Sequence, residues 1–245
     1  MISYRSGNPA LSSKTFKNIS SHHADDIMTL DGTVNKIAMS LLILLSTAFY
    51  SFTNGKIEYI WLGIIGGLIL AITTIFKKEW APYTVPLYAA LEGLALGGIS
   101  LIYEHMYTGI VQQAVFLTFG IFVALLFAYK TKIIAPTENF KLGIFAATGG
   151  IGIVYLVNFI MSFWGSGISI MNIENASTIS IGFSVFVVII ASLNLVLDFD
   201  FIEQGAEAGV PKYMEWYGAF GLLVTLIWLY LEILRLLAKL QSRRN

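Results

Sequence analysis

The sequence predicts an all-α polytopic membrane protein with seven transmembrane helices. Of its 245 residues, 56% are hydrophobic and only 12% are charged, whereas soluble domains carry about 25% charged residues. The mean hydropathy is +0.74. The apolar residues form separate blocks close to the roughly 20 residues that a helix needs to cross a bilayer. Length, composition and block structure together predict a bundle of membrane-spanning helices.

The seven apolar blocks divide the chain into a tail, a membrane domain and a short basic end. Residues 1–33 are polar and rich in Ser and Asn, so we expect a partly flexible N-terminal tail. Residues 34–240 form the predicted transmembrane domain, and residues 241–245 a basic C-terminal tail. The predicted spans are Val34–Phe52, Ile60–Phe76, Val85–Tyr103, Ile110–Tyr129, Leu142–Phe163, Ile179–Asp198 and Trp216–Leu237.

The basic residues predict that the N-terminus is cytoplasmic, because cytoplasmic loops are enriched in Lys and Arg. In that orientation ten basic residues lie inside: Arg5, Lys14, Lys17, Lys36, Lys77, Lys78, Lys130, Lys132, Lys141 and Lys212. Five lie outside: Lys56, Arg235, Lys239, Arg243 and Arg244. The basic C-terminus departs from the rule. Either it is tolerated outside, or the last helix does not fully cross and the tail returns to the cytoplasm.

Glycines spaced for close helix packing occur in three of the predicted spans. Gly63 and Gly67 are four residues apart, as are Gly93 and Gly97, and the fifth span carries Gly149, Gly150 and Gly152. Small residues at this spacing let helix backbones approach within a bilayer. We therefore expect these glycines to lie in helix–helix contacts rather than in a ligand site.

Three acids lie within or at the edge of the apolar blocks, namely Glu92, Asp198 and Glu232. A charged side chain at membrane depth is costly, so such residues usually face a partner or water. Structural interpretations remain open for each acid. Asp198 can simply mark the end of its helix, and Arg235, three residues after Glu232, can form a structural ion pair with it. Glu92 has no basic residue within a turn and must be protonated, hydrogen-bonded or hydrated.

The functional interpretation of the acids is a path for cations. Carboxylates are hard oxygen ligands suited to Ca²⁺, or they can carry protons. Asn194 stands one helical turn before Asp198 and faces the same way, and Asn158 adds a polar group to the fifth span. We expect Glu92, Asn194 and Asn158 to line the path. No metal site is firmly predicted, although Asp198 and Glu232 are possible Ca²⁺ contacts.

Other functional classes have little support in the sequence. The chain has no cysteine, which excludes thiol catalysis and Cys-ligated metals. His22, His23 and His105 do not form a spaced metal-binding pair. The basic residues are scattered over loops, which argues against nucleic-acid binding. We therefore expect no enzymatic activity and no cofactor.

Four stretches of the chain carry a resemblance to a known family. They are YRSGNPALSSKTF, DIMTLDGTVNK, PLYAALEGLALGGIS and LNLVLDFDFIEQGAEAGVPKYMEWYGAFGLLVTLIWLYLEILRLL. Together they resemble the Bax inhibitor-1 (YccA-like) family, and more specifically its prokaryotic branch with a polar N-terminal tail. The resemblance covers essentially the whole chain and implies a bacterial plasma (inner) membrane protein. It also implies a fold in which helix 7 is central and the other six surround it.

The resemblance implies a function as well. The family is associated with pH-sensitive Ca²⁺ leak and, in eukaryotic relatives, with suppression of cell death, a stress response. Its pH sensor is a pair of aspartates, which Asp198 and Glu232 match by position. Two features depart from the family: the second acid is Glu, and the segment between the acids is longer. A basic partner from helix 2 is not apparent, since only Lys77 and Lys78 stand at its end.

Our leading hypothesis is a cation (Ca²⁺ or H⁺) leak channel gated by a buried carboxyl pair. One shared proton would hold Asp198 and Glu232 together, because two close carboxylates cannot both ionise cheaply. Raising the pH would remove this proton and separate helices 6 and 7. The two acids can meet only if helix 6 continues past Asp198 or helix 7 is displaced. The alternative is a non-conducting regulator that binds a membrane protease or another membrane protein through its tail and helix 6–7 loop.

Overall fold

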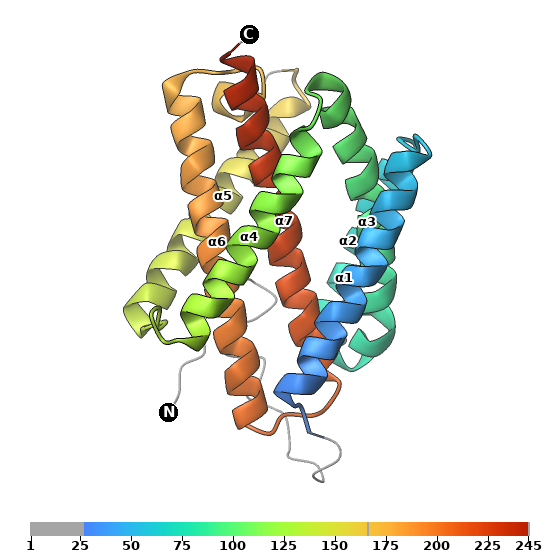
Figure 1. Ribbon diagram of the computed structural model, residues 1–245, viewed down its shortest axis with the longest axis vertical. Helices are drawn as coiled ribbons and strands as arrows, with labels where there is room; N and C mark the ends of the chain where they lie inside the picture. Colours follow the sequence, from blue (N-terminus) through green and yellow to red (C-terminus); the bar gives the residue numbers. More distant parts are fainter. Residues whose placement is uncertain (1–26, 166, 245) are drawn as a thin grey trace.

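The computed structural model describes residues 27–165 and 167–244, which fold into seven long helices (Figure 1). All seven are long and apolar enough to cross a membrane. The helices are α1 (Leu30–Thr53), α2 (Tyr59–Phe76), α3 (Ala81–Met106), α4 (Ile110–Lys130), α5 (Glu138–Ser162), α6 (Thr178–Glu207) and α7 (Met214–Ser242). Two short 3₁₀ helices, η3 (Lys78–Trp80) and η4 (Ser169–Met171), precede α3 and α6. The predicted all-α, seven-span fold class is confirmed.

Local capping determines where several helices begin. The side chains of Thr29, Thr137 and Ser177 each accept a hydrogen bond from a backbone N–H in the first turn of α1, α5 and α6. Hydroxyl groups at this position satisfy amides that have no partner within the helix. As a result α1 begins at Leu30, inside the segment predicted as tail, and Asp31 lies in its first turn. Most of that tail, residues 1–26, lies outside the described part of the chain.

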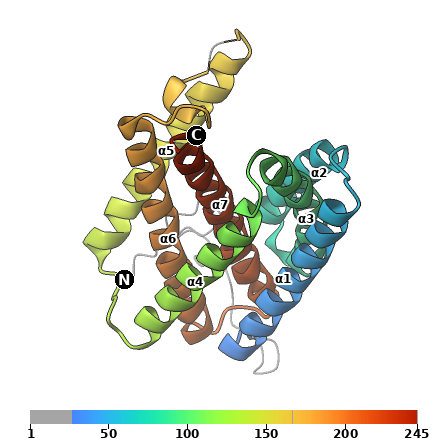
Figure 2. The same ribbon diagram turned by 45° about the horizontal axis from the view of Figure 1, so that its top comes forward.

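Helix α7 is the central element of the bundle. Its core-facing residues are the most extensively buried of the seven spans. It packs against α1, α3, α4 and α6, whereas α2 packs mainly on α3, and α5 mainly on α6 (Figure 2). The predicted centre is therefore correct, but α2 and α5 form outer positions rather than part of a complete ring around α7.

The last helix crosses the bundle completely. It runs without interruption from Met214 to Ser242 and ends on the side opposite the start of α1 (Figure 1). Within residues 214–244 the chain does not turn back, so the alternative of a returning C-terminal segment is wrong. Helix α6 also continues beyond its predicted end at Asp198, to Glu207.

The glycine prediction is correct for α2 and α3. A Cβ atom added at Gly63 would overlap Leu91 O of α3, and one added at Gly97 would overlap Ala48 O of α1. A Cβ atom added at Gly93 would likewise overlap Leu44 O of α1, whereas one added at Gly67 would meet the Glu92 side chain of α3. The glycines therefore draw α1, α2 and α3 into a closely packed layer.

The same prediction is wrong for α5. A Cβ atom added at Gly149, Gly150 or Gly152 would meet no other atom within 4 Å. These glycines lie on surface that no other described helix covers, because α5 packs on α6 through a different face. Spacing alone did not show which face of α5 would be used.

Candidate functional site

Polar side chains form a line along the α5–α6–α7 side of the bundle. This line, which we call the polar column, consists of Lys239, Arg235, Glu232, Tyr155, Asn194, Thr148 and Asp198. Its members come from the C-terminal half of α7, the middle of α5 and the middle and second half of α6. The α6–α7 interface is otherwise apolar, so these groups are the main hydrophilic feature of this side.

Lys239 stands at the end of the column nearest the C-terminus and is fully buried. Its Nζ donates to Ile170 O at 2.7 Å, to Ser184 Oγ at 2.9 Å and to Ser180 O at 3.3 Å. An ammonium group has three donors, so all three are used. Lys239 thereby joins the end of α7 to η4 and to the first turns of α6.

One turn further along α7 lies a three-residue cluster built around Glu232. Arg235 Nη1 contacts Glu232 Oε1 at 2.7 Å, which is the ion pair expected from their spacing. Tyr155 of α5 donates a hydrogen bond to the same carboxylate oxygen, and Arg235 Nη1 also reaches the Tyr155 hydroxyl at 3.0 Å. The guanidinium lies over the Tyr155 ring, 5.4 Å from its centre. Glu232, only 2% exposed, is thus paired and hydrogen-bonded, as a buried charge requires.

The next polar layer consists of Asn194 and Thr148. Asn194 Nδ2 donates to Thr148 Oγ1 and to Ile190 O, both at 2.8 Å. Its Oδ1 is buried and accepts no hydrogen bond from the described residues. Asp198 follows one turn later on the same face of α6 and is fully buried. The predicted proximity of Asn194 and Asp198 is therefore present.

The structure does not bring Asp198 and Glu232 together. The contacts of Lys239 with Ser180 and Ser184 fix the antiparallel register of α6 and α7. From that register Asp198 lies about nine residues, or about 13 Å, further along α6 than the level of Glu232. The predicted carboxyl pair is therefore wrong in this structure. Helix α6 does extend beyond Asp198, so the loop to α7 begins later in the chain. This extension does not change the depth of Glu232 and therefore does not bring the two acids together.

Glu92 and Asn158 lie outside the polar column. The Glu92 carboxylate lies against the backbone of α2, where it occupies the space that a Cβ of Gly67 would need. Glu92 thus faces away from α6, although its depth is close to that of Asp198. Asn158 Oδ1 accepts from Ile168 N at 2.8 Å and so holds the loop after α5. Of the predicted path residues, only Asn194 lies beside a predicted gate residue.

Sequence reasoning missed three members of the column. Tyr155 and Thr148 stand in an apolar helix, where one hydroxyl per turn is a weak signal. Lys239 was assigned to the flank of the last span, but its side chain folds into the bundle. The sequence did contain a signal for Lys239. This lysine lies seven residues, about two helical turns, after Glu232, and therefore on the same face of the helix.

The opposite end of α6 carries a second group of polar contacts. Lys141 of α5 is buried, and its Nζ lies 2.8 Å from Asp200 Oδ2. Gln204 donates to the same carboxylate, and Tyr129 of α4 donates to Glu203. These contacts connect the start of α5 and the end of α4 to the last turns of α6.

The start of α1 is attached to the loop between α6 and α7. Met28 N donates to Val210 O at 2.7 Å. The N–H and hydroxyl of Thr29 donate to Glu215 Oε1 at 3.1 and 3.0 Å, and Glu215 is buried. The segment that leads out of the N-terminal tail therefore packs directly against the α6–α7 loop.

No cluster of three or more His, Cys, Asp or Glu side chains among residues 27–165 and 167–244 has the geometry to hold a metal ion. His22 and His23 lie outside this range, and His105 is at the exposed end of α3. The chemistry that the described arrangement offers is therefore that of hydroxyl, carboxyl, guanidinium and ammonium groups in an apolar surrounding.

Seven apolar spans, of which the central one carries buried charged side chains, define a polytopic integral membrane protein. A family model described as Bax inhibitor 1 like matches residues 8–242, nearly the whole chain. The chain therefore belongs to the Bax inhibitor 1-like family. No curated protein and no solved structure matches it.

Proposed function

We propose that the protein is a cation leak pathway whose route is the polar column between α5, α6 and α7. The observation that carries the proposal is the length of the column. From Lys239 to the level of Asp198 it follows about 24 Å of helix, most of the roughly 30 Å hydrocarbon core. Ionisable groups in a membrane interior are costly and commonly mark ion or proton routes.

The charges in the column support protons over Ca²⁺ as the conducted ion. Arg235, which is partly buried, and Lys239, which is fully buried, place two cations beside a single carboxylate, Glu232. A divalent cation passing them would be repelled strongly in a low-dielectric interior. Hydroxyl, carboxyl and amide groups can instead pass a proton along hydrogen bonds. In this conformation a Ca²⁺ leak would require the Lys239 ammonium to leave its three oxygen partners.

The proposed gate is the Glu232 cluster rather than a pair of acids. The Glu232 carboxylate attracts Arg235 and accepts from Tyr155, and so holds α5 against α7. Tyr103 of α3 and Lys239 of α7 also interact electrostatically with this cluster. Neutralising the Glu232 side chain, as in Glu232→Gln, would cancel the charge that holds Arg235 and weaken the contact with the Tyr155 hydroxyl.

Burial of basic side chains supports a cytoplasmic N-terminus. Arg235, Lys239 and Lys141 are engaged within the bundle and do not act as loop charges. Three basic residues then remain on the C-terminal side, namely Lys56, Arg243 and Arg244, against nine on the other side. This distribution agrees with the positive-inside rule. We propose a bacterial plasma membrane as the location and assign the protein no enzymatic step.

Flux measurements on liposomes that contain the full chain test the proposal. Proton flux is followed with a trapped pH dye and Ca²⁺ flux with a trapped Ca²⁺ dye, at several pH values. Asp198→Asn is expected to lower proton flux by at least about tenfold, the usual scale for loss of a proton-transfer group. Glu232→Gln is expected to raise flux, because it removes the charge that holds Arg235. Glu92→Gln, which changes an acid at the same depth outside the column, should behave like wild type.

The outcome that overturns the proposal is unchanged flux and pH response in both Asp198→Asn and Glu232→Gln. Equal loss of flux in Glu92→Gln would also contradict it, because that acid lies on the far side of α7. Ca²⁺ flux greater than proton flux in wild type would overturn protons as the conducted ion. The same variants would then still test the polar column as the route.

One observation favours a second candidate function, a non-conducting regulator that binds a membrane protease or another membrane protein. Met28 and Thr29 fasten the start of α1 to the α6–α7 loop, so residues 27–29, which follow the tail in sequence, and that loop lie on one face. Together they can offer a single contact surface to a partner. Deletion of residues 1–26 abolishes partner capture under this candidate and leaves liposome flux intact under the first. Loss of flux on deletion, with capture retained, contradicts the regulator.

A further inference from the structure

We propose that a groove between α1, α3, α4 and α7 binds one membrane lipid with an ammonium headgroup, of the phosphatidylethanolamine class. The groove lies on the other side of α7 from the polar column, so the inference is independent of the proposed leak. Its cavity volume is about 700 Å³. This value lies within the 300–1,000 Å³ typical of small-ligand sites.

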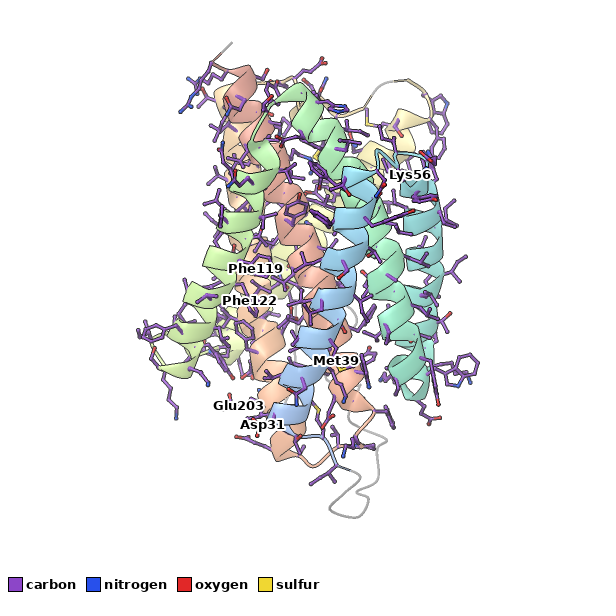
Figure 3. All side chains as sticks on the ribbon, turned by 45° about the vertical axis from the view of Figure 1, so that its right-hand side comes forward. Asp31, Met39, Lys56, Phe119, Phe122 and Glu203 are labelled. Atoms are coloured by element: carbon purple, nitrogen blue, oxygen red, sulfur yellow. The ribbon has the colours of Figure 1, made fainter. Side chains whose placement is uncertain are left out.

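The walls of the groove are apolar and open sideways. Leu41 and Leu44 of α1 face Leu223 and Leu226 of α7 across it. Figure 3 shows Phe119 on α4 at the side of that helix turned toward α1. Phe49 of α1 and Phe116 of α4 also line the groove, and each is 69% exposed. A chain from the surrounding bilayer can therefore enter between α1 and α4 without displacing any helix.

One end of the groove is polar. Ser100 Oγ and Tyr230 Oη form a 2.6 Å hydrogen bond there. The Glu104 carboxylate accepts from Gly109 N at 2.6 Å and from Val111 N at 3.1 Å, so its position is fixed by the start of α4. Each carboxylate oxygen can accept a further hydrogen bond. Glu104 is the only charged residue among the described residues that line the groove, which include no Lys or Arg.

The position of the polar end matches the orientation of a lipid. Glu104 lies near the end of α3, at the membrane boundary, whereas Leu223 lies near the middle of the bundle. A lipid in the leaflet on this side has its headgroup at the boundary and its chain toward the midplane. The groove offers the Glu104 carboxylate at the boundary, where the headgroup lies, and apolar walls toward the midplane, where the acyl chain lies.

The charge at the polar end selects the headgroup. An ammonium group complements the Glu104 carboxylate, whereas an anionic glycerol phosphate headgroup would meet a negative charge with no basic partner. We therefore assign the acyl chain of the lipid to the apolar walls of the groove and its ammonium group to a contact with Glu104.

Lipid binding to the purified full chain in detergent tests the inference by native mass spectrometry. The probes are palmitoyl-oleoyl phosphatidylethanolamine and the phosphatidylglycerol with the same chains. Wild type is expected to bind one phosphatidylethanolamine at least about tenfold more tightly than phosphatidylglycerol. Val115→Trp, which fills the groove, should weaken binding by at least about tenfold. Leu117→Trp, on the same helix but outside the groove, is the matched control and should bind like wild type.

Glu104→Gln tests the headgroup separately from the chain. It should still bind a lipid, with the preference for phosphatidylethanolamine reduced to about one. Equal binding of both lipids by wild type, or a preference retained in Glu104→Gln, overturns the headgroup assignment. Wild-type binding by Val115→Trp, or equal weakening in Leu117→Trp, overturns the groove as the site.

Discussion

The two sides of α7 are held together by different forces. On one side, α1, α2 and α3 approach so closely that the glycines of α2 and α3 touch neighbouring backbones. On the other side, α5 meets the bundle through a small apolar cluster with α6 and through polar contacts, and its glycines contact no other part of residues 27–165 and 167–244. The first side depends on close backbone packing, whereas the second combines a small apolar cluster with a few hydrogen bonds and ion pairs.

This difference indicates which part of the bundle can move. Close backbone packing is lost as soon as helices separate, so α1, α2 and α3 are expected to behave as one rigid layer. Three polar contacts fasten α5 along its length: Lys141 with Asp200, Thr148 with Asn194, and Tyr155 with the Glu232 cluster. Each can be exchanged for water if water enters, and α5 is therefore the element expected to move when the route opens.

The largest effect is expected from breaking the ion pair of the Glu232 cluster. Arg235→Met leaves the Glu232 carboxylate buried without its cation, and breaking such a pair from one side costs about 3–5 kcal/mol. The double variant Arg235→Met/Glu232→Gln removes both charges and should recover most of the lost free energy of unfolding. Denaturant unfolding in detergent measures both. If the losses of free energy of unfolding in the two single variants simply add in the double variant, the Arg235–Glu232 pair does not hold this side of the bundle together.

A smaller effect is expected from overpacking the rigid layer. Gly97→Ala places a methyl group against Ala48 O of α1. Overpacking of this kind costs about 1–3 kcal/mol. Denaturant unfolding in detergent again measures the change. An unchanged free energy of unfolding would mean that α1 and α3 can move apart without loss of stability.

The arrangement of the rigid layer could be predicted from sequence because it depends on local pattern. Apolar blocks of the right length indicate the spans, and small residues four apart in α2 and α3 indicate a close approach. The identity of the central helix came from family resemblance, because the hydropathy of α7 lies within the range of its neighbours. The unused glycines of α5 show the limit of spacing, since the same motif occurs where no helix lies opposite it.

The polar column could be predicted only in part, because its geometry depends on register between distant helices. The pairing of Arg235 with Glu232 follows from a three-residue spacing along one helix. The depth of Glu232 relative to Asp198 depends instead on how α6 and α7 align. That alignment is set by Lys239 and its oxygen partners, which belong to three separate segments. Tyr155 reaches Glu232 from a helix 77 residues earlier in the chain, a contact that no local pattern indicates.

An intermediate effect is expected from releasing the start of α5. Lys141→Met removes the contact with Asp200, which is partly exposed, so solvent can replace much of the lost interaction. The expected loss is about 1 kcal/mol, the upper range for pairs that water reaches. Hydrogen exchange should become faster in the first turns of α5 and stay unchanged in α3. Faster exchange throughout the bundle would contradict a separately held α5.

The smallest effect, and one of opposite sign, is expected from Gly150→Ala in α5. Alanine is favoured over glycine in a helix by up to about 1 kcal/mol, and the added methyl group meets no atom within 4 Å. The substitution should therefore stabilise the protein slightly, whereas the same change at Gly97 destabilises it. Unfolding of the two variants in parallel measures the contrast. A loss of stability in Gly150→Ala would mean that something covers the glycine face of α5 in the folded protein, and the comparison between the two sides of α7 would then fail.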